Sequence, residues 1–80
     1  MDDTDIVQRI GQLADEERML EESHVGRGLS EEELARLRSL EVALDRCWDL
    51  LRQRRALRAA GQDPDDADVR PQAVVEGYRQ

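Results

Sequence analysis

The 80-residue sequence has no phenylalanine and only one residue each of tryptophan, tyrosine and cysteine. A single cysteine excludes an intramolecular disulfide, and a lone thiol without a signal-peptide pattern is typical of a protein in the reducing cytoplasm. No apolar run approaches the ~20 residues of a transmembrane helix. We therefore expect a soluble, cytoplasmic protein with one small domain and little material for a large core.

Lysine is also absent, so 12 arginines stand against 19 acidic residues, and the net charge is −7. That sign disfavours non-specific binding to nucleic acid or to anionic membranes. The charges are unevenly placed: residues 1–24 carry eight acidic residues and two arginines, whereas residues 50–60 carry four arginines and no acidic residue. This asymmetry predicts that the acidic start and the basic segment are neighbours in the fold.

One amphipathic stretch, residues 34–51, is the centre of the predicted fold. Apolar side chains recur there at every third or fourth position, which places them in one stripe along an α-helix. The stripe consists of Leu34, Leu37, Leu40, Leu44, Cys47, Trp48 and Leu51. Ser30 and Glu33 have the spacing of a capping box and Gly61 is a stop signal, so this helix is predicted over residues 31–60.

A first helix is predicted over residues 4–24. Its seam has gaps of three and four residues, as in a coiled coil, with two polar members. The seam consists of Ile6, Ile10, Leu13, Glu17, Leu20 and His24. Gly26 and Gly28 provide positive-φ positions for a turn over residues 25–29. Gly11 weakens the helix but would permit a close approach by its neighbour.

Two long helices joined by a short turn must lie antiparallel. Residues 1–61 are therefore predicted to form an all-α, coiled-coil-like hairpin. Counting from the turn places Ile10 near Leu44 and Ile6 near Trp48. The same register places the carboxylates of residues 2, 3 and 5 beside Arg52 and Arg55.

Residues 62–80 are predicted to form an extended tail, because they begin with an acidic, proline-containing segment. Leu50 and Leu57 form a minor apolar edge outside the main stripe of the second helix. Either the tail, through Val75 and Tyr78, or a second copy of the chain would cover that edge. We expect the hairpin to pair with itself, most simply as a homodimeric four-helix bundle. The predicted interaction residues are Trp48, Leu50, Leu51, Leu57, Val75 and Tyr78.

Glu21 and His24 form an E-x-x-H step on one helix face, with Glu17 one turn earlier and Glu41 on the second helix. In ferritin-like bundles such a step, joined by glutamates of neighbouring helices, binds two metal ions. One histidine without a second motif rarely makes a site. The preferred interpretation is therefore that Glu17 and Glu41 set the helix register and pair with Arg38. We expect no cofactor and keep a metal-binding bundle as an alternative.

Cys47 lies on the apolar stripe, far from His24 as an activating base, so it is interpreted as a small core residue and not as a nucleophile. The basic cluster consists of Arg52, Arg54, Arg55 and Arg58. It lacks the interleaved aromatic residues of a nucleic-acid site, and arginine near a helix C-terminus is favoured by the helix dipole. Pairing with the acidic N-terminus is the preferred interpretation, and a weak arginine-mediated nucleic-acid binder is the alternative.

The stretch LEVALDRCWDLLRQRR at residues 40–55 resembles a family of short actinobacterial proteins catalogued only as a domain of unknown function. The resemblance extends to DDTDI at residues 2–6 and to VEGY at residues 75–78, and so covers nearly the whole chain. It implies a bacterial cytosolic protein and carries no known activity. We therefore expect a structural or protein-interaction module that is not an enzyme.

Overall fold

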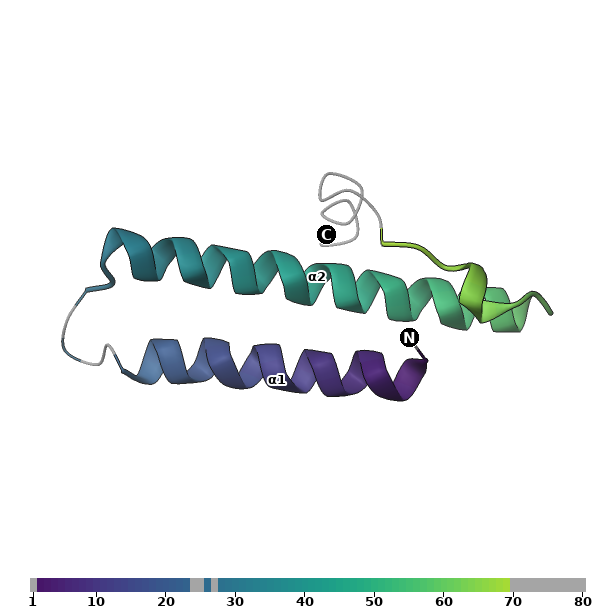
Figure 1. Cartoon of the computed structure of the whole chain (residues 1–80), viewed down its shortest axis with the longest axis horizontal. Coiled ribbons are helices and arrows are strands. Elements are labelled where there is room, and N and C mark those ends of the chain that lie inside the picture. The colour runs from purple at the N-terminus through teal and green to yellow at the C-terminus, as the bar shows by residue number, and fades with distance from the viewer. Residues whose placement is uncertain (1, 24–25, 27, 70–80) are drawn as a thin grey trace.

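The computed structural model describes residues 2–23, 26 and 28–69. Two α-helices, α1 (Asp3–Glu22) and α2 (Glu31–Ala59), lie antiparallel and pack against each other (Figure 1). A short 3₁₀ helix, η1 (Pro64–Asp66), follows α2, and the described ranges contain no strand. The prediction of an all-α helical hairpin is therefore confirmed.

Both helices begin with a capping box. The Asp2 side chain accepts a hydrogen bond from the Asp5 backbone N–H at 2.8 Å, and the Asp5 carboxylate accepts one from the Asp2 N–H at 3.2 Å. Ser30 and Glu33 form the equivalent bonds at 3.1 and 3.0 Å, as the sequence predicts. Each cap satisfies N–H groups that have no partner inside the helix and contributes about 1 kcal/mol. Because Asp2 is the cap, α1 begins one residue earlier than predicted, and it ends two residues earlier, at Glu22.

A glycine-based cap ends α2. Gly61 has a φ of 74°, and its N–H donates to the carbonyl of Arg58 at 3.0 Å. The N–H of Gln62 donates to the carbonyl of Leu57 at 2.8 Å, which completes a Schellman motif. The positive φ is adopted readily only by glycine, so the chain leaves the helix here. The last helical residue is Ala59, one residue before the predicted end.

Two other glycines differ from their predicted roles. Between the helices, Gly26 has a φ of 87°, but Gly28 is not in the positive-φ region, so only one of the two predicted positions is correct. At Gly11, a Cβ atom would meet nothing within 4 Å. The expected close approach of α2 to Gly11 is therefore wrong, and this residue faces open space on α1.

The core is a narrow seam of aliphatic side chains between the two helices. In the described ranges the buried hydrophobic residues are Ile6, Ile10, Leu13, Leu40 and Leu51. Ile6 packs in one cluster with Ile10 and Leu51, and Leu44 lies against it. The register that placed Ile6 beside Trp48 is wrong, since Leu51, about one turn further along α2, takes that place. Trp48 instead keeps 45% of its surface exposed.

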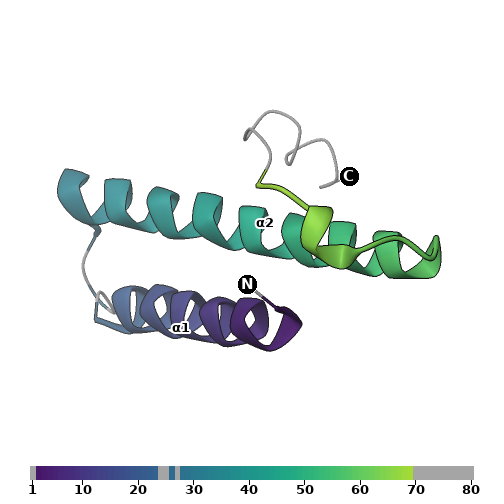
Figure 2. The same ribbon diagram turned by 45° about the vertical axis from the view of Figure 1, so that its right-hand side comes forward.

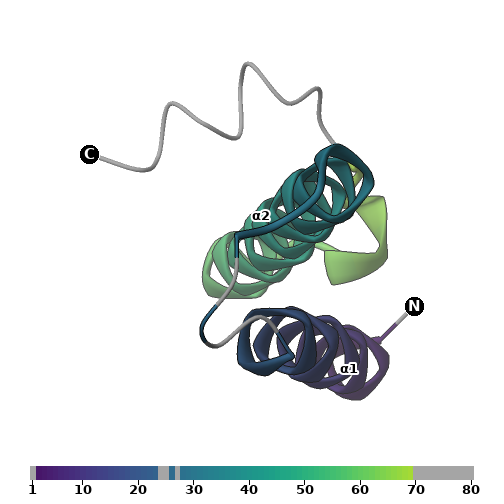
Figure 3. The same ribbon diagram turned by 90° about the vertical axis from the view of Figure 1, so that its left-hand side faces the viewer.

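The start of the tail turns back along α2 (Figures 1 and 2). The Asp63 side chain caps η1 by accepting the Asp65 N–H at 2.9 Å, and Pro64 occupies the first position of the turn. The described part of the predicted extended tail thus contains one short helical turn, after which the backbone at Ala67 is extended. Viewed along the helices, residues 62–69 lie on one side of the hairpin, near the start of α1 (Figure 3).

Candidate interaction surface

Arg54 joins the open end of the hairpin to the returning segment. Its side chain is buried, with 6% of the residue exposed. The Nε donates to Asp3 Oδ1 at 2.6 Å, and a terminal nitrogen donates to Asp65 Oδ1 at 2.9 Å and to the Pro64 carbonyl at 3.2 Å. A guanidinium is tolerated in a buried position only when its donors are satisfied in this way. Arg54 thereby links α1, α2 and η1.

Asp3 is shared by two arginines of α2. Arg58, in the last turn of α2, also donates a hydrogen bond to its carboxylate. The hydrogen bonds from Arg58 and Arg54 lower the pKa of Asp3 from 3.8 to about 2. The acidic start of the chain therefore meets the basic end of α2, as predicted. The prediction that Arg52 and Arg55 lie beside these carboxylates is wrong. Arg54 and Arg58, which are four residues apart on one helix face, point toward α1 and pair with Asp3.

Gln53 holds the far end of the returning segment. Its side-chain nitrogen donates to Asp49 Oδ2 at 2.9 Å and to the Asp68 carbonyl at 2.6 Å. Its side-chain oxygen accepts the Asp68 N–H at 3.3 Å. Asp49 is fully buried, whereas Val69 is largely exposed. Polar contacts through Gln53 therefore fix this segment on α2.

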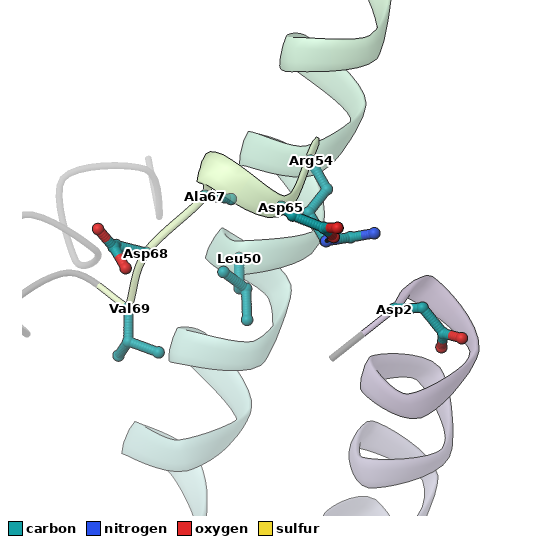
Figure 4. A pocket seen from close by; sticks show the side chains of 7 residues that line it. All are labelled: Asp2, Leu50, Arg54, Asp65, Ala67, Asp68 and Val69. Atoms are coloured by element: carbon teal, nitrogen blue, oxygen red, sulfur yellow. Dashed lines mark hydrogen bonds and ion pairs between the residues drawn. The ribbon is translucent and has the colours of Figure 1, made fainter. Parts of the chain in front are cut away.

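An open hollow of about 420 Å³ separates the returning segment from the helices (Figure 4). Its lining consists of Asp2, Leu50, Arg54, Asp65, Ala67, Asp68 and Val69. The predicted apolar edge is thus partly accounted for: Leu50 lines this hollow, and Leu57 is half-buried. Val75 and Tyr78, which were predicted to dock at this edge, lie outside the described residues. The charge of Arg54 is already engaged by Asp3 and Asp65.

The opposite side of the hairpin presents a second surface around Trp48. Leu50 faces the returning segment, and Trp48, two residues earlier, lies about 160° away around α2. A shallow depression beside Trp48 is lined by Glu17 of α1 and by Glu41, Leu44 and Asp45 of α2. Leu51, which was predicted as an interaction residue, is not accessible here, because it is buried in the core.

Helix α1 contributes Val7 to this same side. Arg9 lines a hollow with Leu50 and Val69 on the side of the returning segment. Val7, two residues before Arg9, points about 160° away from it and is 53% exposed. We define the Trp48 face by the residues Val7, Glu17, Glu41, Asp45, Trp48 and Arg55.

Acidic side chains gather at the turn-side half of the Trp48 face. Burial raises the pKa of Glu17, and the neighbouring carboxylates of Glu21, Glu41 and Asp45 raise it further. Such a cluster of like charges disfavours ionisation of the most buried member. The face therefore has an acidic half, while Arg55 lies at its other end.

The pairing predicted for Arg38 with Glu17 and Glu41 is not formed in the described part of the chain. Instead, Arg36 donates to Glu16 across the two helices. Within the described ranges, no group of three or more histidine, cysteine or acidic side chains is arranged to hold a metal ion. His24, the histidine of the proposed metal motif, lies outside those ranges.

Cys47 packs against the core cluster, on the edge of the apolar stripe away from Trp48. Burial raises the pKa of its thiol, although Arg9 acts in the other direction. A thiol with a raised pKa is protonated at neutral pH and is a poor nucleophile. This geometry agrees with the interpretation of Cys47 as a small core residue.

Comparison with known proteins places this hairpin in a family. A family model described as "Protein of unknown function (DUF2630)" matches residues 2–80. The chain belongs to this family. An uncharacterised protein of Mycobacterium tuberculosis and one of Mycobacterium bovis are each 51% identical to it over 77 residues, which is 95% of this chain and 88% of theirs. No solved structure matches the chain.

The resemblance to short actinobacterial proteins is thereby confirmed for this DUF2630 member. In its described residues, neither helix combines the length and the apolar composition needed to cross a bilayer. The buried Arg54 was missed by sequence reasoning. The sequence offers one signal for its burial. Arg54 lies between Leu50 and Leu57, which form the minor apolar edge, and an acidic segment that could pair with it follows α2.

Proposed function

We propose that this DUF2630 protein is an interaction module without catalytic activity, and that it binds a helical surface through the Trp48 face. The exposure of Trp48 carries the proposal. The only tryptophan of the chain keeps 45% of its surface outside a core built of smaller aliphatic side chains. Tryptophan is enriched among the few side chains that dominate the binding energy of protein interfaces.

The width of the apolar stripe on α2 supports this proposal. Cys47 and Trp48 are adjacent in sequence and therefore about 100° apart around the helix. Helix α1 covers the part of the stripe that contains Cys47 and Leu51. The part that contains Trp48 remains partly exposed to solvent. An apolar stripe of about this width normally faces a protein core, and here the Trp48 side of it remains 45% exposed. A second neighbour would remove more apolar surface from water, at about 25 cal/mol per Å².

The arrangement of polar groups also suits a protein interface. Trp48 lies at the centre of the Trp48 face, and Glu41 and Arg55 lie toward its two ends. Interfaces typically have an apolar or aromatic centre and a charged rim that remains hydrated. Rim charges contribute little affinity and mainly set orientation and specificity.

The two other functions considered from the sequence have less support. Arg54 and Arg58 are engaged by Asp3, which leaves a reduced basic surface for nucleic acid. A weak nucleic-acid binder predicts affinity that falls steeply with salt, which gel shifts at low ionic strength test directly. A metal-binding bundle predicts stoichiometric metal in the purified protein, which elemental analysis tests.

Site-specific photo-crosslinking tests the interaction function. A benzophenone-bearing amino acid would replace Trp48 in one variant and Ser39 in a control, with both variants expressed in a mycobacterium. Ser39 is exposed and lies about 180° from Trp48 around α2. We expect discrete crosslinked products from position 48 and none from position 39. Equal products from both positions, or none from either, would overturn the proposal.

A further inference from the structure

Charges of opposite sign lie at equal distances on either side of Trp48. Glu41 is seven residues before it and Arg55 seven residues after it. Seven residues advance an α-helix by about 10.5 Å and turn it to within about 20° of the starting direction. The three side chains therefore follow one line along α2. Glu41 and Arg55 are exposed, and neither pairs with another residue in the described ranges.

This pattern of charges is complementary to the same pattern on a second α2 that runs in the opposite direction. A second α2 laid antiparallel, with Trp48 opposite Trp48, brings each Glu41 opposite Arg55 of the other copy. A two-fold axis repeats the contact, so that one dimer has two such pairs. A parallel arrangement would place Glu41 against Glu41 and Arg55 against Arg55, which costs energy through like-charge repulsion.

We infer that the partner of the Trp48 face is a second copy of this chain, packed antiparallel about a two-fold axis at Trp48, with Glu41 of each copy paired with Arg55 of the other. This inference rests on the proposed function and names its partner. It also gives the register and direction of the four-helix bundle that two hairpins would form.

The acidic half of the Trp48 face supports this arrangement. The carboxylates of Glu17, Glu41 and Asp45 lie close together there, and burial together with like charge raises the pKa of Glu17. Arg55 of the second copy would bring a positive charge to this cluster.

The available surface is sufficient for a dimer of modest affinity. The two helices overlap over the 20 residues of α1, which is about 30 Å, and two neighbouring helices are roughly 20 Å wide. The face then measures about 600 Å² per copy, or about 1,200 Å² for the pair, at the lower end of stable interfaces. A reversible, concentration-dependent dimer is the expected state.

Reversal of single charges tests the register. In Glu41→Arg, both contacts of a homodimer become arginine against arginine, and in Arg55→Glu both become carboxylate against carboxylate. Each variant alone should dimerise more weakly by roughly tenfold or more. In an equimolar mixture, the two arginines of the first variant face the two carboxylates of the second, so heterodimers should form. Arg46→Glu, which changes the charge away from the Trp48 face, is the matched control and should dimerise like the original chain.

Sedimentation equilibrium and native mass spectrometry on the full chain measure these outcomes. Preferential heterodimers in the mixture would confirm the antiparallel register and would show that both variants fold. Dimers of the original chain that are equally strong in both single variants would overturn the register. A monomer at all concentrations, combined with a discrete product of another protein at position 48 in the photo-crosslinking experiment, would overturn the second copy but leave the proposed function intact. Absence of both would overturn the two together.

Discussion

Removal of the Leu51 side chain is the sharpest test of the hairpin core. Leu51 is 2% exposed and packs in one cluster with Ile6 and Ile10. Leu51→Ala removes three carbon atoms, each worth about 0.8 kcal/mol of transfer free energy, or roughly 2.4 kcal/mol together. The cavity left behind adds to this loss, and buried leucine-to-alanine changes cost about 2–5 kcal/mol. Because only two helices surround the site and can relax toward it, we expect a loss of about 2–3 kcal/mol.

Such a loss is a large part of the stability of a domain of this size, which rarely exceeds about 3–5 kcal/mol. Leu51→Val, with a smaller expected loss of about 1 kcal/mol, therefore accompanies Leu51→Ala and keeps the measurement within range. Leu34→Ala is the matched control, since Leu34 is 37% exposed and lies outside the cluster. The control should cost less than half as much as Leu51→Ala.

Urea unfolding followed by circular dichroism, at one fixed protein concentration, measures these differences. The concentration is fixed because self-association would stabilise the folded state by mass action. A loss below about 1 kcal/mol for Leu51→Ala, or equal losses for Leu51→Ala and Leu34→Ala, would contradict the packing described above.

Three other changes test separate parts of the structure. Because the pKa of Asp3 is lowered to about 2, its stabilisation is complete above the ordinary value of 3.8 and is lost as the pH falls toward 2. Asp3→Asn should therefore flatten the dependence of stability on pH in this acidic range, and an unchanged slope would contradict the ion pair. Gly11→Ala should raise the free energy of unfolding by about 1 kcal/mol, seen as a higher melting temperature, because a Cβ there meets nothing. A destabilised Gly11→Ala would show that another helix contacts this position. Gln53→Ala should speed hydrogen exchange at the Asp68 amide by roughly tenfold, whereas the exposed Gln12→Ala should leave it unchanged.

Local signals in the sequence were sufficient to predict the hairpin. Ser30 and Glu33 form the predicted capping box because its geometry depends only on neighbouring residues. The prediction that α2 ends near Gly61 was close for the same reason. The acidic start and the basic end meet as expected, since opposite charge and antiparallel helices both favour that contact.

The register between the helices was not predictable at the level of single residues. A shift of about one turn places Leu51 beside Ile6 and exchanges which arginines reach Asp3. The periodicity shows that Trp48 belongs to the apolar stripe of α2. It does not show which edge of that stripe remains exposed when α1 packs against the other edge. The burial of Asp49 had no signal in the sequence. Its hydrogen bond with Gln53 is local to α2, but the contact of Gln53 with Asp68 spans 15 residues and is not visible in the helical periodicity.

Collisional quenching of Trp48 fluorescence, measured over a range of protein concentrations, tests the central claim most directly. The chain has one tryptophan, so the signal reports this face alone. We predict that Trp48 is accessible to iodide and acrylamide in dilute protein, and becomes protected as the mass in solution rises from 9.2 kDa toward twice that value. Complete protection of Trp48 in dilute, monomeric protein would contradict the claim that this face is open. Accessibility that stays constant at all concentrations, together with no crosslinked product at position 48 in cells, would contradict the claim that the face binds a partner.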